Sequence, residues 1–225
     1  MNSDEIHIVL NDIVLPARLY LPDQPKGLVI AVQGRNCKVL KVQNDHLLRA
    51  LSSRNIAILF TYLLDPPENQ EFDIPLDIGL MTERLEMVTK WSCRQRSLQN
   101  IPIGYFAANT AAAAAMEASI SIGNRIRAIV SHCGRPDLAS PELHLIKPAT
   151  LLITGSENRY LTELNRQAYR LLSCETEMVT FVGDPGNFEA TGAARRIAQL
   201  SADWFEYHLL VQSSKHASKT IEHAD

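Results

Sequence analysis

The chain has 225 residues, of which 46% are hydrophobic and 21% charged, with a formal net charge of −3 and a sequence pI near 6.2. This composition is typical of a soluble globular domain and excludes a disordered or fibrous chain. The acidic balance gives no overall attraction to nucleic acid or to an anionic membrane, and the apolar runs are too short to span a bilayer. We therefore expect one packed domain without nucleic-acid binding or membrane insertion.

The start of the chain and its cysteines indicate a cytoplasmic protein. The opening "MNSDEIHIVL" has acidic residues where a secretory signal has a basic cluster, and no apolar core of signal length follows. The four cysteines and seven histidines are scattered without CxxC or metal-ligand spacing. We expect free thiols, no disulfide framework, no metal and no cofactor.

Strands and helices alternate along the first part of the chain. Residues 5–10 and 13–22 predict an opening antiparallel pair of strands, and "GLVIAVQG" at 27–34 predicts a buried strand that ends in turn residues. An amphipathic helix is expected over 44–55 and a further strand over 56–64.

The next loop, 65–75, is rich in Pro, Asp and Glu, and we expect it to form a surface lid. The helix after it has an apolar stripe through Leu80, Leu85, Val88 and Trp91. The alternation then continues with strands at 101–106, 126–134, 149–156 and 177–183, an Ala-rich helix after the first of them, and helices at 161–172 and 193–210.

Alternation of this kind predicts a mostly parallel sheet with helices on both faces. The polar residues 212–225 predict a flexible tail, so the folded domain is expected to span 1–211. Functional groups of parallel sheets gather at the carboxyl ends of the strands. Here these ends carry residues 33–35, Asn109, 132–137 and 156–158.

Several segments resemble dienelactone-hydrolase-like members of the α/β-hydrolase fold. They are "IPIGYFAANTAAAAA", "AIVSHCGRPDL", "KPATLLITG" with "ELNRQAY", and "LSADWFEYHL". The resemblance covers roughly residues 5–210. It implies a three-layer α/β/α sandwich with an eight-stranded, mostly parallel sheet and no large cap domain.

The same resemblance implies that the catalytic triad is replaced. The family's nucleophile elbow usually reads G-x-S-x-G or G-x-C-x-G, whereas here it reads A-A-N-T-A, with Asn109 in the nucleophile position. Asn158 of "GSEN" stands where the acid is expected, and Gly186 of "GDPGNFE" stands where the histidine is expected. These side chains provide no nucleophile, no negative charge and no base, which a triad requires.

For other residues of these segments, the sequence predicts a role in helix capping or in ligand binding. Asn109 is expected to cap the following helix and to tolerate a left-handed backbone. Thr110 stands where the family uses a backbone N–H as an oxyanion donor, and its hydroxyl is expected to add a further cap. "VQGRN" matches the family's oxyanion loop, with Gln33 in place of the usual His and Gly34 kept. Arg35 is either a group that holds a small anionic or carboxylate ligand or an exposed loop residue.

Cys133, with His132 beside it, is the fallback nucleophile. Because adjacent strand residues point to opposite faces, we expect Cys133 to be a small buried hydrophobe instead. Asp184 and Glu189 flank Gly186 and are the remaining candidates for a base.

Arg135 and Asp137 of "GRPDL" are expected to form an ion pair or cap that fixes their loop.

The sequence therefore predicts a catalytically inactive α/β-hydrolase-like protein that acts as a binding, regulatory or structural subunit. The alternative is an active ester or lactone hydrolase that uses displaced residues. A subunit role predicts an exposed apolar patch for a protein partner. The candidates are the loop 65–75 and the helix face that carries Trp204 and Phe205.

Overall fold

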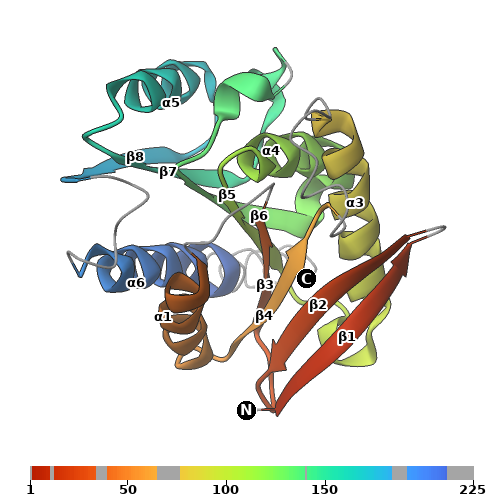
Figure 1. Ribbon diagram of the computed structural model, residues 1–225. Coiled ribbons are helices and arrows are strands. Elements are labelled where there is room, and N and C mark those ends of the chain that lie inside the picture. Colours follow the sequence, from red (N-terminus) through yellow and green to blue (C-terminus); the bar gives the residue numbers. More distant parts are fainter. Residues whose placement is uncertain are drawn as a thin grey trace, which may run out of the picture.

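The computed structural model describes residues 2–10, 13–33, 40–64, 77–139, 141–183 and 192–211. An eight-stranded sheet in the order β1-β2-β4-β3-β5-β6-β7-β8 forms its centre (Figure 1). β1 pairs with β2 and β2 with β4 in antiparallel orientation, and the other pairs are parallel, as predicted. The strands are β1 (Asn2–Leu10), β2 (Ile13–Leu21), β3 (Gly27–Gln33), β4 (Ile56–Tyr62), β5 (Ile103–Ala108), β6 (Ile126–His132), β7 (Ala149–Gly155) and β8 (Thr176–Phe181).

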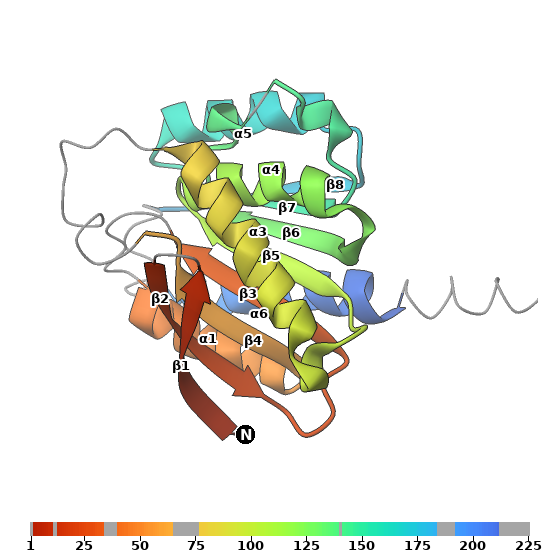
Figure 2. The ribbon, with the colours of Figure 1, turned by 90° about the vertical axis from the view of Figure 1, so that its right-hand side faces the viewer.

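Helices cover both faces of the sheet, which confirms the three-layer architecture (Figures 1 and 2). One face carries α1 (Leu40–Ser52) and α6 (Ala193–Phe205), and a π-helical segment, η6 (Glu206–Val211), continues α6. The other face carries α3 (Ile78–Arg94), α4 (Ala111–Ile122) and α5 (Arg159–Leu171). Short 3₁₀ turns, η1 (Arg96–Leu98), η2 (Gly123–Arg125), η3 (Pro136–Leu138) and η4 (Leu143–Leu145), complete the described elements.

The central strands are apolar along their whole length because both of their faces are covered. Every residue of β3, β5 and β7 is buried, and the side chains form one hydrophobic cluster on each face. The alanines of Ala111–Ala115 have no exposed surface, so the first half of α4 is buried on all sides, and the helix lies against β5 and β6.

The α1 and α6 helices are joined by charge as well as by packing. The guanidinium of Arg54, just after α1, donates to Asp203 of α6 and, from its Nε, to Glu206 at 2.8 Å. The Arg54 side chain is 13% exposed, so this pairing is better shielded from water than an ordinary surface ion pair. It fixes the two helices on their shared face.

The ends of several elements differ from the sequence prediction. β6 ends at His132 rather than at 134, because Cys133 takes a left-handed backbone with φ of 48°. The α-helical part of α6 ends at Phe205, where the π-helical segment begins. Helix α1 begins at Leu40 and ends at Ser52, earlier than predicted at both ends.

The prediction of an exposed apolar patch on the last helix is wrong. Trp204 and Phe205 are only 8% and 0% exposed, and the Trp204 indole N–H donates to the Ala149 carbonyl at 3.3 Å. Both side chains belong to the core on the α6 face. The predicted lid 65–75 and the predicted tail 212–225 lie outside the described residues. Among the described helices, none has the length and apolar character needed to cross a bilayer.

Replacing Gly104 of β5 by alanine tests how closely α6 packs on the sheet. A Cβ there would lie 2.5 Å from Cε1 of the buried Phe205 ring. We expect Gly104→Ala to lower the free energy of unfolding in urea by about 1–3 kcal/mol, because the ring must shift. Gly79→Ala, in the exposed first turn of α3, is the control and should cost no more than about 0.5 kcal/mol. Equal losses in both variants would contradict the packing.

Candidate functional site

The candidate site lies at the carboxyl edge of the sheet, where four parallel strands end side by side. Gln33 of β3 pairs with Ala108 of β5, Ala108 with His132 of β6, and His132 with Ile153 of β7. The residues that follow these strands therefore meet at one edge, as the sequence predicted.

Asn109 forms a sharp turn between β5 and α4. Its φ of 53° is left-handed, as expected for an Asn at this position. Its N–H donates to the His132 carbonyl at 3.2 Å, and its own carbonyl accepts from the N–H groups of Ala112 at 3.2 Å and Arg135 at 3.0 Å. This strand-turn-helix arrangement is that of a nucleophile elbow, with a carboxamide at its apex.

The Thr110 side chain does not add the cap that the sequence predicted. With φ of −69° and ψ of −25°, Thr110 already has a helical backbone, and its side chain makes no capping hydrogen bond. An N-cap side chain reaches the first-turn N–H groups from a non-helical backbone, which Thr110 lacks.

Small residues allow α4 to approach the loop after β6. A Cβ on Gly134 would lie 2.0 Å from Ser131 Oγ and 2.5 Å from the Ala112 Cβ. Ala107 and Ala111, which replace the glycines of the usual elbow, have no exposed surface. The elbow therefore keeps its close packing without those glycines.

Asn158, at the position expected for the acid, is an exposed helix cap. Its Oδ1 accepts a hydrogen bond from the Leu161 N–H at 2.9 Å and so caps α5. A neutral carboxamide performs this task as well as a carboxylate does. The structure thus accounts for Asn158 without any catalytic role.

The loops after β7 and β8 are joined beside Asn158. The Ser156 hydroxyl accepts from the Gly183 N–H at 3.2 Å, and the Glu157 N–H donates to the Gly183 carbonyl at 3.3 Å. The loop that holds the expected base thus starts next to the loop that holds the expected acid. Gly186 itself, with Asp184 and Glu189, lies outside the described residues.

Cys133 and His132 lie on the same side of the sheet, contrary to the prediction. The His132 ring stacks on Phe106 with a centroid distance of 6.1 Å, and Cys133 packs into the cluster that contains Phe106. Strand alternation does not apply, because Cys133 follows the end of β6 with φ of 48°. Both residues are buried, with 4% and 6% of their surface exposed, and burial lowers the pKa of His132 to about 4.

Arg135 and Asp137 form the predicted ion pair in the loop that contacts the elbow. Arg135 donates from Nε to Asp137 Oδ1 at 2.8 Å and from Nη2 to Oδ2 at 2.7 Å. The hydrogen bonds to Asp137 raise the pKa of Arg135. Gly34 and Arg35, the predicted oxyanion-loop residues, lie outside the described residues, so an anion site at Arg35 stays a prediction.

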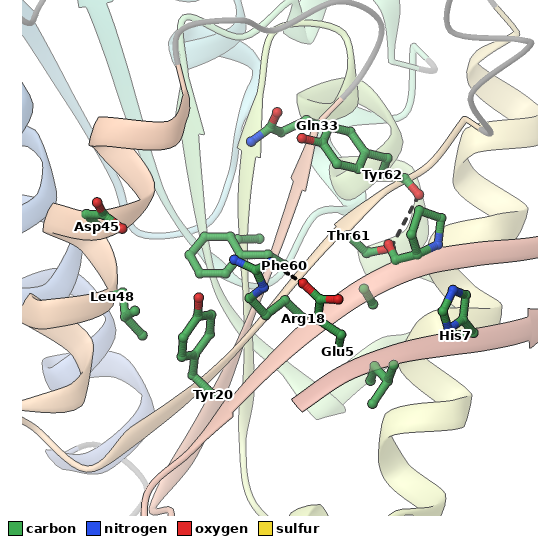
Figure 3. A pocket seen from close by; sticks show the side chains of 14 residues that line it. Glu5, His7, Arg18, Tyr20, Gln33, Asp45, Leu48, Phe60, Thr61 and Tyr62 are labelled. Carbon is green, nitrogen blue, oxygen red and sulfur yellow. Dashed lines mark hydrogen bonds and ion pairs between the residues drawn. The ribbon is translucent and has the colours of Figure 1, made fainter. Parts of the chain in front are cut away.

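A cavity of about 470 Å³ begins at Gln33, and none of the elbow residues 107–111 lines it (Figure 3). It runs from Gln33 at the end of β3 along the α1 side of the sheet to the β1–β2 hairpin. Apart from Gln33, sequence reasoning missed its lining, because the lining depends on strand register and on the position of α1. The lining residues are Glu5, Ile6, His7, Pro16, Ala17, Arg18, Tyr20, Ala31, Gln33, Asp45, Leu48, Phe60, Thr61 and Tyr62.

None of the described cysteines, Cys93, Cys133 and Cys174, is in a disulfide bond. Within the described ranges, no three His, Cys, Asp or Glu side chains are grouped to hold a metal ion.

The backbone at Asn109 gives a first prediction for this site. Because its φ is 53°, Asn109→Val should lower the free energy of unfolding by about 1–3 kcal/mol, whereas Asn109→Gly should be nearly neutral. The same pair of substitutions at Asn124, whose φ is not positive, is the control and should not show this order. Urea unfolding of the four variants measures the difference. A valine at 109 that is as stable as glycine would contradict the left-handed turn.

The buried imidazole of His132 predicts a pH dependence of stability. Its pKa is about 4 in the folded chain and about 6.5 when unfolded, so only the unfolded chain gains this proton between those values. Stability should therefore fall as the pH drops from about 6.5 to 4, by roughly 2–3 kcal/mol from this group alone.

His132→Phe should remove that part of the pH dependence and keep a ring against Phe106. His144→Phe, at an exposed position in η4, is the matched control and should leave the dependence unchanged. Urea unfolding between pH 4 and pH 7.5 provides the comparison. Parallel curves for the wild type and His132→Phe would show that His132 does not carry the effect.

No protein-family model matches the chain. Two proteins from Mycobacterium tuberculosis strains, both named "Putative phosphoribosyl transferase", are 32% identical to it over 209 residues. The match covers 93% of this chain but 47% of theirs, so the chain spans about half the length of these curated relatives.

Solved structures match over more than 90% of both chains. A dienelactone hydrolase from Anabaena variabilis superposes with a TM-score of 0.85 and 28% identity, over 92% of this chain and 98% of that one. A putative dienelactone hydrolase from Klebsiella pneumoniae has a TM-score of 0.68 at 18% identity, over 91% and 98% of the two chains. The chain therefore has the α/β-hydrolase fold, with dienelactone hydrolase and related α/β-hydrolases as its structural neighbours.

Proposed function

We propose that this chain is an α/β-hydrolase-like protein without hydrolase catalysis, acting as a binding, regulatory or structural subunit. One observation carries the proposal: the elbow is folded with φ of 53° at its apex, and the apex residue is Asn109. The turn that presents a nucleophile is present, and the nucleophile is absent. A carboxamide has neither an ionisable O–H nor a thiol to activate.

The acid and base positions agree with this reading. Asn158 is neutral, and its oxygen is already bonded to the Leu161 N–H, so it does not supply the negative charge that orients a catalytic histidine. Gly186, which the sequence resemblance places at the histidine, has no side chain. The proposed loss therefore affects every step that a triad performs.

The alternative is a hydrolase that uses Cys133 and His132. Their shared side of the sheet favours it, because the alternation of strand residues does not separate them. Burial opposes it, since a thiol that is 6% exposed in an apolar cluster has little access to an ester carbonyl. An imidazole with a pKa of about 4 is also a weak base at neutral pH.

The names of the curated relatives suggest which enzyme such a subunit would accompany. A dienelactone hydrolase aligns over 98% of its own length, whereas the matched region is 47% of the relatives named phosphoribosyl transferase. We propose that this name describes the half of those relatives that lies outside the match. The present chain would then be a hydrolase-like unit that accompanies a phosphoribosyl transferase, within one polypeptide or as a separate subunit.

Esterase assays on p-nitrophenyl acetate and on a dienelactone test the proposal. We expect the wild type to match the uncatalysed rate, and Asn109→Ser combined with Asn158→Asp and Gly186→His to exceed it. The control carries Asn109→Ala with the same two other changes. A rebuilt triad should exceed this control by at least about 100-fold, the scale of positioned acid–base catalysis.

Turnover by the wild type would overturn the proposal. In that case Cys133→Ala and His132→Phe decide whether the displaced pair is responsible. Loss of activity in both variants, with Cys93→Ala unaffected, would establish the alternative, because Cys93 is a free thiol away from the elbow on α3.

A further inference from the structure

The cavity that begins at Gln33 has two unlike walls. β1 and β2 bury Ile8 and Leu15 against the core on the α3 side, and turn their other face toward α1. That other face carries Glu5, His7, Arg18 and Tyr20. Asp45 and Leu48 of α1 lie opposite these residues across the cavity (Figure 3).

The inner end of the cavity has a buried acceptor. Gln33 is 6% exposed, and within the described part of the chain its Oε1 accepts no hydrogen bond. The other buried polar side chain of the lining, Thr61, already donates to the Pro16 carbonyl at 3.2 Å. A buried carbonyl oxygen without a donor is costly. Oε1 is itself covered from solvent, so a ligand N–H in the cavity reaches it once the Gln33 carboxamide rotates, and then recovers a hydrogen bond.

The charges of the lining favour a cation over an anion. Arg18 donates to Glu5, so the only guanidinium of the lining is already neutralised by a carboxylate. Asp45 on the opposite wall is exposed and has no ion-pair partner within the described ranges. Among the carboxylates and guanidinium of the lining, Glu5 and Asp45 contribute −2 and Arg18 contributes +1, which gives a net charge of −1.

Aromatic side chains line the space between the hairpin and Gln33. Tyr20 and Phe60 meet edge to face with ring centroids 5.9 Å apart, and Tyr62 is 42% exposed. Aromatic rings bind flat rings by stacking and cations by their electron-rich faces. The lining thus combines flat apolar surface, one buried acceptor and excess negative charge.

We infer that this cavity binds a small flat aromatic molecule that carries a cationic or amine N–H group, with the N–H groups directed at Gln33 Oε1. This goes beyond the proposed function, because the cavity lies on the hairpin side of α1 and its ligand does not depend on whether the elbow catalyses. It also differs from the carboxylate ligand that the oxyanion-loop resemblance predicted.

Three probes of the same shape test the inference: benzamidine, benzamide and benzoate. They carry a cation with N–H donors, a neutral amide and an anion without donors. We expect saturable binding of benzamidine with a Kd on the order of 1 mM, weaker binding of benzamide and none of benzoate. Titrations followed by ¹H–¹⁵N NMR give both the affinity and the place of binding. The largest shifts are expected at Ala31, Phe60 and Tyr62.

Two variants and their controls locate the binding groups. Gln33→Met keeps the size of the side chain and should weaken benzamidine by about tenfold, while leaving the unbound protein at least as stable, because no buried carbonyl remains unpaired. Asp45→Asn should weaken it roughly twofold to fivefold, and less at high salt. Gln167→Met on α5 and Glu83→Gln on α3, both exposed positions on the opposite face, should leave binding unchanged.

Several results would overturn the inference. They are benzoate binding as tight as benzamidine binding, no saturable binding of any probe, unchanged affinity in Gln33→Met, or shifts that gather at Asn109 and Arg135. The last result would place the ligand at the elbow. Loss of folding in Gln33→Met, detected by its NMR spectrum, would also contradict the expected stability of that variant.

Discussion

The left-handed turn at Asn109 is the constraint on which the site depends. Three backbone hydrogen bonds hold this turn. The Asn109 N–H donates to the last carbonyl of β6, and the Asn109 carbonyl accepts from the N–H groups of Ala112 and Arg135. They join the end of β5, the first turn of α4 and the loop after β6 at one residue. None of them uses the side chain at position 109. The shape of the elbow is therefore independent of the chemistry that an elbow usually presents.

The carboxyl edge thus separates into two regions with different properties. Around Asn109 the side chains are small or engaged: Asn158 caps a helix, and Arg135 is bonded to Asp137. On the α1 side of Gln33 the lining is aromatic and charged, and one buried acceptor lacks a donor. Under the proposal that the first region does not catalyse, the same scaffold can still recognise a molecule at the second. Fold and function are separable in this way, because a site depends on a few neighbouring side chains whereas the fold depends on packing throughout the domain.

Most of the fold could be predicted from the sequence. In α/β proteins, the spacing of apolar residues along the chain indicates both the type of each element and which of its residues are buried. Buried strands such as β3 and β7 read as continuous apolar runs, and an Asn at the apex indicated a turn that few other residues tolerate. Cys133 is buried, as predicted, but its face relative to His132 was predicted wrongly, because a single backbone angle that residue types do not reveal ends the alternation of β6.

The cavity could not be predicted for a related reason. Its lining residues come from β1, β2, β3, β4 and α1, and their proximity depends on the pairing of Glu5 with Arg18 and on where α1 rests. Periodicity assigns each of these residues to an outer face of its own element. Only tertiary structure shows that those outer faces enclose a common space.

The helix cap at Asn158 has a consequence for how this protein changes over evolutionary time. Asn and Asp cap helices equally well, and a negative charge at the start of α5 is, if anything, favoured by the helix dipole. A change from Asn to Asp at this position, or the reverse, therefore has almost no effect on folding stability. If position 158 is the acid position that the resemblance implies, a lineage can lose or regain that acid by a substitution that leaves stability intact, and the charge there then records selection on chemistry.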